Sequence, residues 1–429
     1  LFMLAIISLL SDQVFLTPVQ NNALFQYIND HQSEYIQRLK NWVAIESDSS
    51  DPSKRDQVQL MMEMTKDYIL KMGGHVEMAE IGEQEYSPGI KLPLPPVILA
   101  QIGNDTNKPT VCFYGHMDVQ PANKEDGWKT EPYTLVEENG NLFGRGTSDD
   151  KGQILALLHG VESVKKIGLP VNVKLVIEGM EEVGSQGLEK LVEDKKDTFF
   201  ADVDYIVVTD TPWLSKKPGI TYGARGNCYF FLEVEGARRD LHSGSFGGTV
   251  YEAMSDLIFL LGQLTDAKGK ILIPGAFSGS GTKTVIPAKV IAKFSIRQVP
   301  NMNPSVVEKQ VTDYFESKFS ERKSPNKMKV TMVIGAQPWI ANMNDPLYVA
   351  AQKAVKKVFN TDADMIRAGG TIPIAKSFEE ILGKTVMLLG IGGPDDAPHG
   401  QNEKISKHNY IEGTKLYGSL LQEIAHAWP

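Results

Sequence analysis

Between residues 109 and 215 the spacing of the apolar residues switches repeatedly between the period of a strand and that of a helix. Helical spacing is clearest after residue 150, where Ile154, Leu155, Leu158 and Val161 recur on one face. This alternation predicts a mostly parallel central sheet flanked by helices. The expected strands are 110–114, 171–177 and 205–209, and the expected helices are 151–167 and 186–199.

The pattern changes from about residue 219 to a β-α-β-α-β order, which indicates a smaller inserted α+β domain. Its expected elements are strands 228–234, 283–296 and 328–334 and helices 249–264 and 304–319. The α/β character resumes near residue 345 and ends in a helix over 410–427. Because 429 residues exceed one ordinary core, two domains are expected. We assign a discontinuous catalytic domain to 20–218 and 341–429, and a lid domain to 219–340.

Metal-binding side chains follow three of the expected strands. His116, the Glu181–Glu182 pair and Asp210 each come directly after a strand, and the carboxyl ends of parallel strands meet at one edge of a sheet. Asp149 begins a helix, where the helix dipole favours a carboxylate. Singly, these residues have ordinary readings as a structural histidine, a helix cap or an acidic turn. Together they predict five ligands: His116, Asp149, Glu182, Asp210 and His399.

Five ligands are too many for a closed tetrahedral zinc site, but they suit two metals that share one carboxylate and leave a position for water. We expect Asp149 to be the shared ligand, and a strained peptide bond to Asp150, for instance a cis bond, is a plausible consequence. We assign Glu181 as the general base and Glu182 as the ligand, although spacing alone permits the reverse. Asp118 is expected to orient the ring of His116. The pattern predicts metal-assisted hydrolysis.

Composition limits the partners and the compartment. A net charge of −9 and a pI near 5.5 argue against a nucleic-acid partner and against a basic membrane-surface patch. Cys112 and Cys228 are expected to be buried free thiols. The apolar run over residues 1–10 is too short to span a bilayer and resembles the middle of a signal peptide. We therefore expect residues 1–19 to be a truncated signal peptide of a secreted protein; the alternatives are an N-terminal helix packed on the domain and a cytoplasmic protein.

These motifs resemble the carnosinase and nonspecific dipeptidase branch of the dinuclear-zinc metallopeptidases, which also include aminoacylases. The resemblance runs from about residue 25 to the C-terminus, and within the branch the secreted type is the most similar. It includes Asp-Leu-His242-Ser-Gly, Phe-Ser-Ile-Arg297 and Arg-Ala-Gly-Gly370-Thr371-Ile-Pro. The resemblance implies a homodimeric, carboxypeptidase-type metallodipeptidase that acts on dipeptides such as carnosine and anserine. Its cofactors would be two divalent ions, zinc or alternatively manganese.

The resemblance also implies roles in substrate binding. His242 would reach the active site of the partner subunit and stabilise the oxyanion. Arg297 and Thr284 would hold the C-terminal carboxylate of the substrate, which an arginine fork suits geometrically. Gly370 and Thr371 would line the substrate pocket.

One departure from the family leaves other functions open. The family carries a longer segment between Pro274 and Ala276, which Gly275 joins directly in this chain. A shortened lid domain could weaken dimerisation or remove substrate contacts while sparing the metal ligands. This departure leaves a catalytically disabled metal-binding isoform as one alternative. An aminoacylase or deacylase on the same two-metal site is a second alternative, which the site residues alone leave open.

Overall fold

The structure, a computed structural model, describes residues 18–87, 89–242, 248–264, 276–277, 285–286 and 288–428. The chain divides into two compact units. Unit 1 comprises Leu1–Thr221, Asn342–Ile366 and Ser377–Pro429, and unit 2 comprises Tyr222–Ala341 and Arg367–Lys376. Residues 367–376, which the sequence assigned to the catalytic domain, therefore belong to unit 2. The expected signal peptide lies almost entirely outside the described residues, since α1 begins at Pro18.

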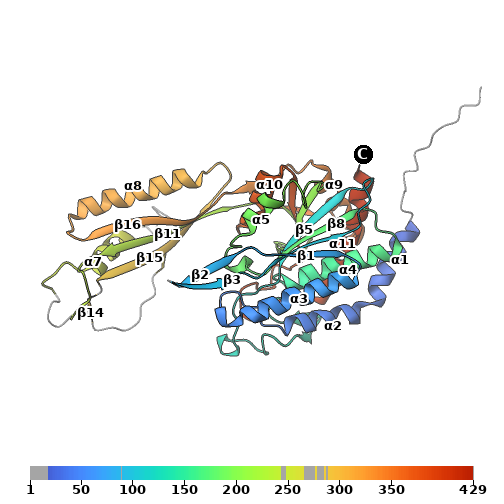
Figure 1. The fold of residues 1–429 in the computed structure, drawn as a ribbon, viewed down its shortest axis with the longest axis horizontal. Coiled ribbons are helices and arrows are strands. Elements are labelled where there is room, and N and C mark those ends of the chain that lie inside the picture. Colours follow the sequence, from blue (N-terminus) through green and yellow to red (C-terminus); the bar gives the residue numbers. More distant parts are fainter. Residues whose placement is uncertain are drawn as a thin grey trace, which may run out of the picture. The chain divides into compact units, whose positions relative to one another are not determined.

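A nine-stranded sheet has its parallel centre in unit 1, whereas β17 and parts of β10 and β18 belong to unit 2 (Figure 1). Its order is β1-β4-β8-β5-β9-β19-β10-β17, with β18 paired to β10. The four parallel central strands are β8 (Asn172–Glu178), β5 (Thr110–His116), β9 (Tyr205–Val208) and β19 (Thr385–Leu388). The other strands are β1 (His75–Ala79), β4 (Val97–Ile102), β10 (Gly219–Ala224), β17 (Trp339–Ile340) and β18 (Asp364–Ala368). The predicted fold class is confirmed.

Helices flank this sheet, and α4 is the one that positions the site. Every residue of β5 and β8 is buried, as is nearly all of α4, because α4 packs against α1, α2 and α11. Gly160 permits the close approach of α11, since a Cβ there would lie 2.9 Å from the Thr414 carbonyl oxygen. Figure 1 shows α2, α3 and α4 stacked on one side of the strands. The helices are α1 (Pro18–Asp30), α2 (Gln32–Val43), α3 (Arg55–Lys71), α4 (Lys151–Ile167), α5 (Leu188–Lys195), α9 (Pro346–Phe359), α10 (Pro373–Leu382) and α11 (Lys407–Ala427).

Unit 2 is an antiparallel sheet with two helices packed on one face. Alternate residues of β11 and β15 are buried, and Phe230 stacks on Phe294 at 5.1 Å in the core beneath the helices. The sheet order is β13 (Ala276–Phe277), β15 (Lys289–Gln298), β11 (Gly226–Glu235) and β16 (Lys327–Ala336), and the helices are α7 (Ala253–Gly262) and α8 (Pro304–Arg322). The single strand expected over 283–296 is two strands, because β14 (Val285–Ile286) pairs with β12 (Leu241–His242) instead of continuing into β15.

Smaller elements complete unit 1. Two further sheets join β2 (Glu83–Ser87) to β3 (Ile90–Pro93), and β20 (Lys404–Ser406) to β7 (Asn141–Phe143) and β6 (Val136–Glu138). Short 3-10 turns cover η1 (Pro52–Lys54), η2 (Lys124–Asp126) and η3 (Glu181–Val183). Cys112 and Cys228 are both buried and free, as predicted. Among the described helices, none is long and apolar enough to cross a membrane.

Candidate metal centre

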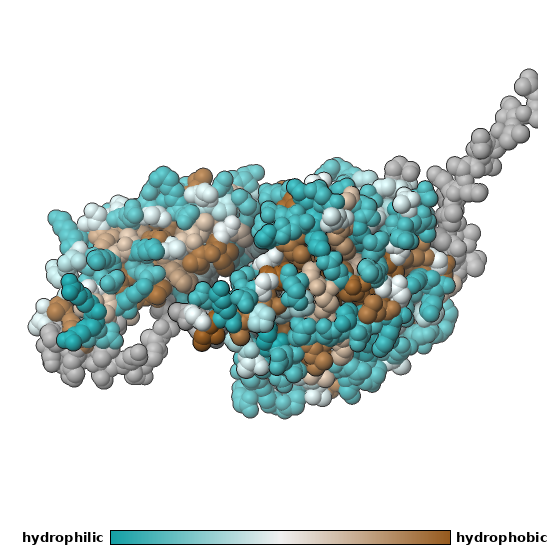
Figure 2. All heavy atoms as spheres, in the orientation of Figure 1, coloured by the Kyte–Doolittle hydropathy of each residue, from teal (hydrophilic) through white to brown (hydrophobic). Residues whose placement is uncertain are grey.

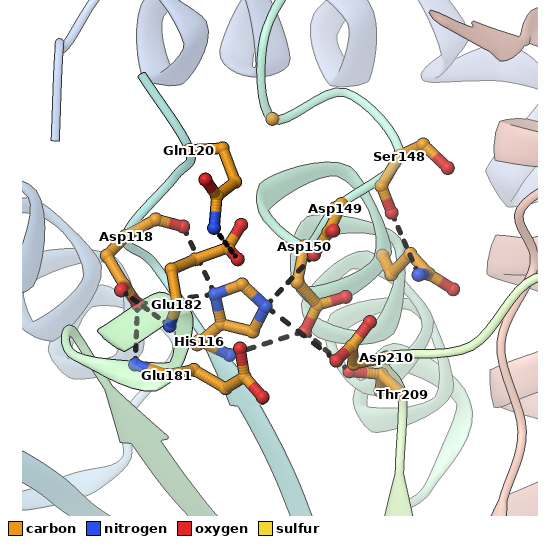
Figure 3. A network of polar contacts seen from close by, with 12 residues as sticks. His116, Asp118, Gln120, Ser148, Asp149, Asp150, Glu181, Glu182, Thr209 and Asp210 are labelled. Carbon is orange, nitrogen blue, oxygen red and sulfur yellow. Dashed lines mark hydrogen bonds and ion pairs between the residues drawn. The ribbon is translucent and has the colours of Figure 1, made fainter. Parts of the chain in front are cut away.

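Three adjacent parallel strands of unit 1 deliver acidic and histidine side chains to one edge of the sheet. His116 ends β5 and lies opposite Glu178, the last residue of β8. The η3 turn follows β8 and carries Glu181 and Glu182, while Asp210 follows β9. Figure 3 shows the side chains of His116, Glu181, Glu182, Asp210 and Asp149 gathered around a common centre. The parallel register therefore brings together residues that are far apart in the chain.

The ligand atoms form two groups, each compact enough to hold one cation. One group is His116, Glu181 and Asp210, the other is Asp149, Glu182 and His399, and within each group the atoms lie within 4.8 Å of one another. The structure thus brings all five expected ligands into one site. It also places Glu181, the expected base, in the same group as His116 and Asp210.

Asp149 lies between the two groups with one carboxylate oxygen facing each. Its Oδ1 is 3.0 Å from Nε2 of His116, and its Oδ2 is 3.0 Å from Nε2 of His399. The same His399 nitrogen is 3.0 Å from Oε2 of Glu182, and His116 Nε2 is 3.9 Å from Oδ2 of Asp210. This arrangement would suit two cations that share the Asp149 carboxylate.

Asp118 connects the imidazole of His116 to the glutamate turn. The Nδ1 atom of His116 is 3.1 Å from the Asp118 carbonyl oxygen and 3.3 Å from its Oδ1. The carboxylate of Asp118 also accepts the backbone N–H groups of Glu181 and Glu182, at 3.2 and 3.1 Å. A proton on Nδ1 leaves Nε2 free to bind a metal, so Asp118 sets both the tautomer and the position of the turn.

The carboxylate of Asp150 makes hydrogen bonds that hold the strand ends next to the site. Its Oδ2 accepts the Thr209 hydroxyl at 2.9 Å and the His116 N–H at 3.3 Å, and the Asp149–Asp150 peptide bond is cis. Gly115 allows this close approach, because a Cβ there would lie 2.4 Å from Oδ2 of Asp150 and 2.3 Å from Cδ1 of Ile154. The glycine before His116 is therefore a steric requirement of the site.

The charges of the site call for cations. Burial raises the pKa of Glu181 well above its usual range, and burial together with the charge of Asp149 raises the pKa of Asp210 to about 7. Hydrogen bonds to Asp149 and Glu182 raise the pKa of His399 to about 10. Burial opposes protonation of His116, but its hydrogen bonds to Asp118 and Asp149 outweigh burial and raise its pKa.

The site gathers four carboxylates, those of Asp149, Glu181, Glu182 and Asp210, around two imidazoles. Two divalent ions would supply the missing positive charge, and the imidazole and carboxylate donors are those that zinc takes in proteins. Imidazole and carboxylate also accommodate manganese. The residues present therefore fit a dinuclear metal site.

The residues expected to bind substrate lie in unit 2. Nη1 of Arg297, on β15, donates to the Thr371 hydroxyl, and the carbonyl oxygen of Gly370 accepts the Arg225 N–H at 3.0 Å. His242 belongs to β12, but its side chain is outside the described part, as is Thr284. The structure thus joins Arg297 to Thr371 within one unit.

Sequence reasoning missed the polar residues that hold the ligands. The amide of Gln120 donates to Oε2 of Glu182 at 2.8 Å and so fixes one ligand from the loop after β5. Its only sequence signal is its place two residues after Asp118. Sequence reasoning gave Glu403 no role, although it lies four residues after His399.

Fold and site together fit a metal-dependent hydrolase. The family model for Peptidase family M20/M25/M40 matches residues 112–423, and the chain belongs to this family. The chain is 47% identical to a Beta-Ala-His dipeptidase of Homo sapiens, over 99% of this chain and 97% of that protein. It is 38% identical to the Cys-Gly metallodipeptidase dug1 of Schizosaccharomyces pombe, over 95% of this chain and 98% of that protein.

A solved structure is similar over almost the whole chain. The crystal structure of human carnosine dipeptidase 1 matches with a TM-score of 0.88 and 47% identity, covering 95% of this chain and 99% of that one. Together with the family and the two ligand groups, these relatives show that the protein is a metallodipeptidase. The alignment to the human Beta-Ala-His dipeptidase extends over 493 positions, more than the 429 residues of this chain. The departure from the family at Gly275 itself falls outside the described residues.

Proposed function

We propose that the protein hydrolyses dipeptides with a C-terminal histidine, such as carnosine and anserine, using two divalent ions that are zinc or, alternatively, manganese. The observation that carries the mechanism is the position of Asp149 between two imidazole-carboxylate groups. The substrate preference rests on the near full-length similarity to Beta-Ala-His dipeptidases. Cys-Gly metallodipeptidases are less similar relatives that also align over almost their whole length. Cysteinyl-glycine is therefore the comparison substrate.

In this proposal the two adjacent glutamates have different tasks. When bound, a pair of divalent cations polarises the scissile carbonyl and acidifies a water. Glu182 acts as a ligand, because its carboxylate groups with Asp149 and His399, and the Gln120 amide holds its Oε2 at 2.8 Å. Glu181 accepts the proton of the water and returns it to the leaving amine. Asp118 holds the backbone of both glutamates and keeps the base at a constant position.

Binding of the substrate carboxylate is assigned to unit 2. Arg297 is exposed and donates to Thr371 through one nitrogen, which leaves further guanidinium donors for a carboxylate. Gly370 lies next to Thr371 and is tethered by Arg225, so this loop has a defined backbone. His242 is proposed to stabilise the oxyanion in the active site of the partner subunit, and Thr284 to assist Arg297.

We further propose a secreted homodimer that associates through unit 2. Among the described residues, most of the exposed large apolar side chains belong to this unit, and Figure 2 shows apolar residues among the polar ones on its visible face. Large exposed apolar patches favour protein contacts. Those at or next to α7 are Val250, Tyr251, Met254 and Ile258. Secretion is supported by the apolar run over residues 1–10.

The first experiment is a hydrolysis panel with purified protein. The protein is stripped with a chelator, reloaded with Zn²⁺ or Mn²⁺, and offered carnosine, cysteinyl-glycine and an N-acetyl amino acid. Metal-restored cleavage of carnosine is the expected result. Cleavage of the N-acetyl amino acid alone would select an aminoacylase. Two bound metals without any cleavage would identify a disabled metal-binding isoform.

Glu181→Gln tests the division of labour between the glutamates. We expect kcat to fall by about 10²–10⁴-fold, the usual contribution of a general base, while two metals per chain remain bound. Glu189→Gln, an exposed acid on α5, is the matched control and should behave like the wild type. Loss of one metal together with activity in Glu181→Gln would instead make Glu181 a ligand alongside His116 and Asp210.

A further inference from the structure

Arg145 and Glu403 form a buried ion pair that neither the ligand set nor the proton transfer uses. Arg145 is 2% exposed and Glu403 is fully buried, and Nη1 of the arginine is 2.7 Å from Oε2 of the glutamate. Desolvating two charges is costly, so such a pair adds little stability unless further hydrogen bonds satisfy both groups. The partners of the pair therefore indicate what it does.

The carboxylate of Glu403 binds the backbone of the loop that carries Asp149. Its Oε1 accepts the N–H groups of Ser148 and Asp149, at 2.9 and 3.0 Å, and its Oε2 accepts the N–H of Gly146 at 3.0 Å. With Arg145 included, each oxygen accepts two donors. Hydrogen bonds to an ionised acceptor are roughly twice as strong as neutral ones. The Glu403 carboxylate therefore holds Asp149, the expected shared ligand, through the backbone N–H of Asp149.

The same pair reaches the two loops that carry the histidine ligands. Glu403 lies four residues after His399, and Nη2 of Arg145 donates to the Gly400 carbonyl oxygen at 3.3 Å. That nitrogen also donates to the Pro121 carbonyl oxygen at 3.4 Å, in the loop that follows His116. The ion pair thus contacts all three segments whose side chains meet at Asp149.

A short β ladder explains why residues so distant in sequence meet here. Lys404 of β20 pairs with Phe143 of β7, and one step further the Gly144 N–H donates to the Glu403 carbonyl oxygen at 2.9 Å. The ladder ends where the loop to Asp149 begins. The side chain of Glu403 therefore meets the loop at the point where the loop has lost its strand partner and its N–H groups need acceptors.

We propose that Glu403 is a positioning residue for the metal centre, which fixes Asp149 so that one carboxylate oxygen faces His116 and the other faces His399. Arg145 compensates the buried charge and ties the two histidine loops to the same point. The inference rests on the proposed metal binding. Groups that hold metal ligands in place change metal affinity or activity by about 10–100-fold when they are altered.

Glu403→Gln keeps the size of the side chain and removes its charge. The new amide nitrogen cannot accept a hydrogen bond, so at least one of the loop N–H groups loses its acceptor. We expect the dissociation constants of Zn²⁺, measured by competition with a chromogenic chelator, to rise by about 10–100-fold. Activity should return toward the wild-type level at excess Zn²⁺, which a loss of folding would not permit.

Asp256→Asn is the matched control. Asp256 is 1% exposed, lies in unit 2, and its carboxylate is bound by Arg322, Ser324 and Asn326. Its substitution should lower the melting temperature without altering the Zn²⁺ dissociation constants. The comparison separates the effect of losing a buried carboxylate from the effect of losing this one.

Wild-type Zn²⁺ affinity in Glu403→Gln, with only the melting temperature reduced, would overturn the inference and make the pair purely structural. If Glu403→Gln does not fold, Glu403→Asp decides, because it keeps the buried negative charge while the shorter side chain withdraws it from the loop N–H groups. Weaker Zn²⁺ binding in Glu403→Asp supports the inference, and wild-type affinity overturns it. Failure of the wild-type protein to bind Zn²⁺ would instead contradict the proposed function.

Discussion

Gly152→Ala should damage the metal centre without touching a ligand. Gly152 lies in the first turn of α4, and its N–H donates to the Gly146 carbonyl oxygen at 3.1 Å. A Cβ at this position would lie 1.9 Å from the carbonyl oxygen of Thr147, whereas ordinary contacts begin at 3.4 Å. The obstructing atom is backbone, so no side chain can rotate away. The loop before Asp149 or the start of α4 must move by about 1.5 Å, the difference between these two distances.

The displacement sets the expected magnitude. Overpacking of this kind costs about 1–3 kcal/mol of unfolding free energy. The moved loop carries Asp149, whose two oxygens each lie 3.0 Å from one histidine. A misplacement of about 1 Å can cost about 10²-fold in rate, so we expect kcat/KM to fall by about that factor at saturating metal.

The assay combines thermal unfolding with steady-state kinetics on the metal-loaded enzyme. Gly262→Ala is the control, because Gly262 ends helix α7 and a Cβ there would meet nothing within 4 Å. Alanine at that site should be neutral or stabilising by up to about 1 kcal/mol. Gly152→Ala with wild-type stability and turnover would refute the steric reasoning. A lowered melting temperature with unchanged kcat/KM would refute the link between the loop and the chemistry.

Two further predictions concern the metals and the thiols. Chelation should lower the melting temperature, and readdition of the metal should restore it. A cation at 100 times its Kd stabilises the folded state by about 2.7 kcal/mol per site. An unchanged melting curve would show that the two ligand groups hold no cation. Burial raises the pKa of the Cys112 thiol to about 12 and that of Cys228 to about 11, so neither carries appreciable thiolate at pH 8. A thiol reagent at pH 8 should therefore label neither cysteine in the native protein and both after denaturation, and stoichiometric labelling of the native protein would contradict their burial.

The central sheet and the identity of the site residues could be predicted from the sequence, because both depend on short-range patterns. Strands β5 and β8 are buried on both faces, so each reads as a mostly apolar run in the sequence. Because the strands are parallel, the residues that follow them lie at one edge of the sheet. The positions of His116, Asp210 and the glutamate pair at this edge therefore follow from the sequence pattern. The apolar pattern predicted one strand over residues 283–296, which was wrong. The segment forms two strands, because β14 pairs with β12 and β15 pairs with β11.

The tertiary structure decided how the ligands are held and which oxygen faces which imidazole. Arg145 and Glu403 are 258 residues apart, and no periodicity in either segment indicates that they meet. The Asp118 carboxylate likewise binds N–H groups more than sixty positions away. Residues 367–376 join unit 2 through contacts with Arg225 and Arg297 and not through their place in the chain. Side-chain spacing records which face of an element is buried, whereas these contacts exist only after the strands have paired and α4 has packed against them.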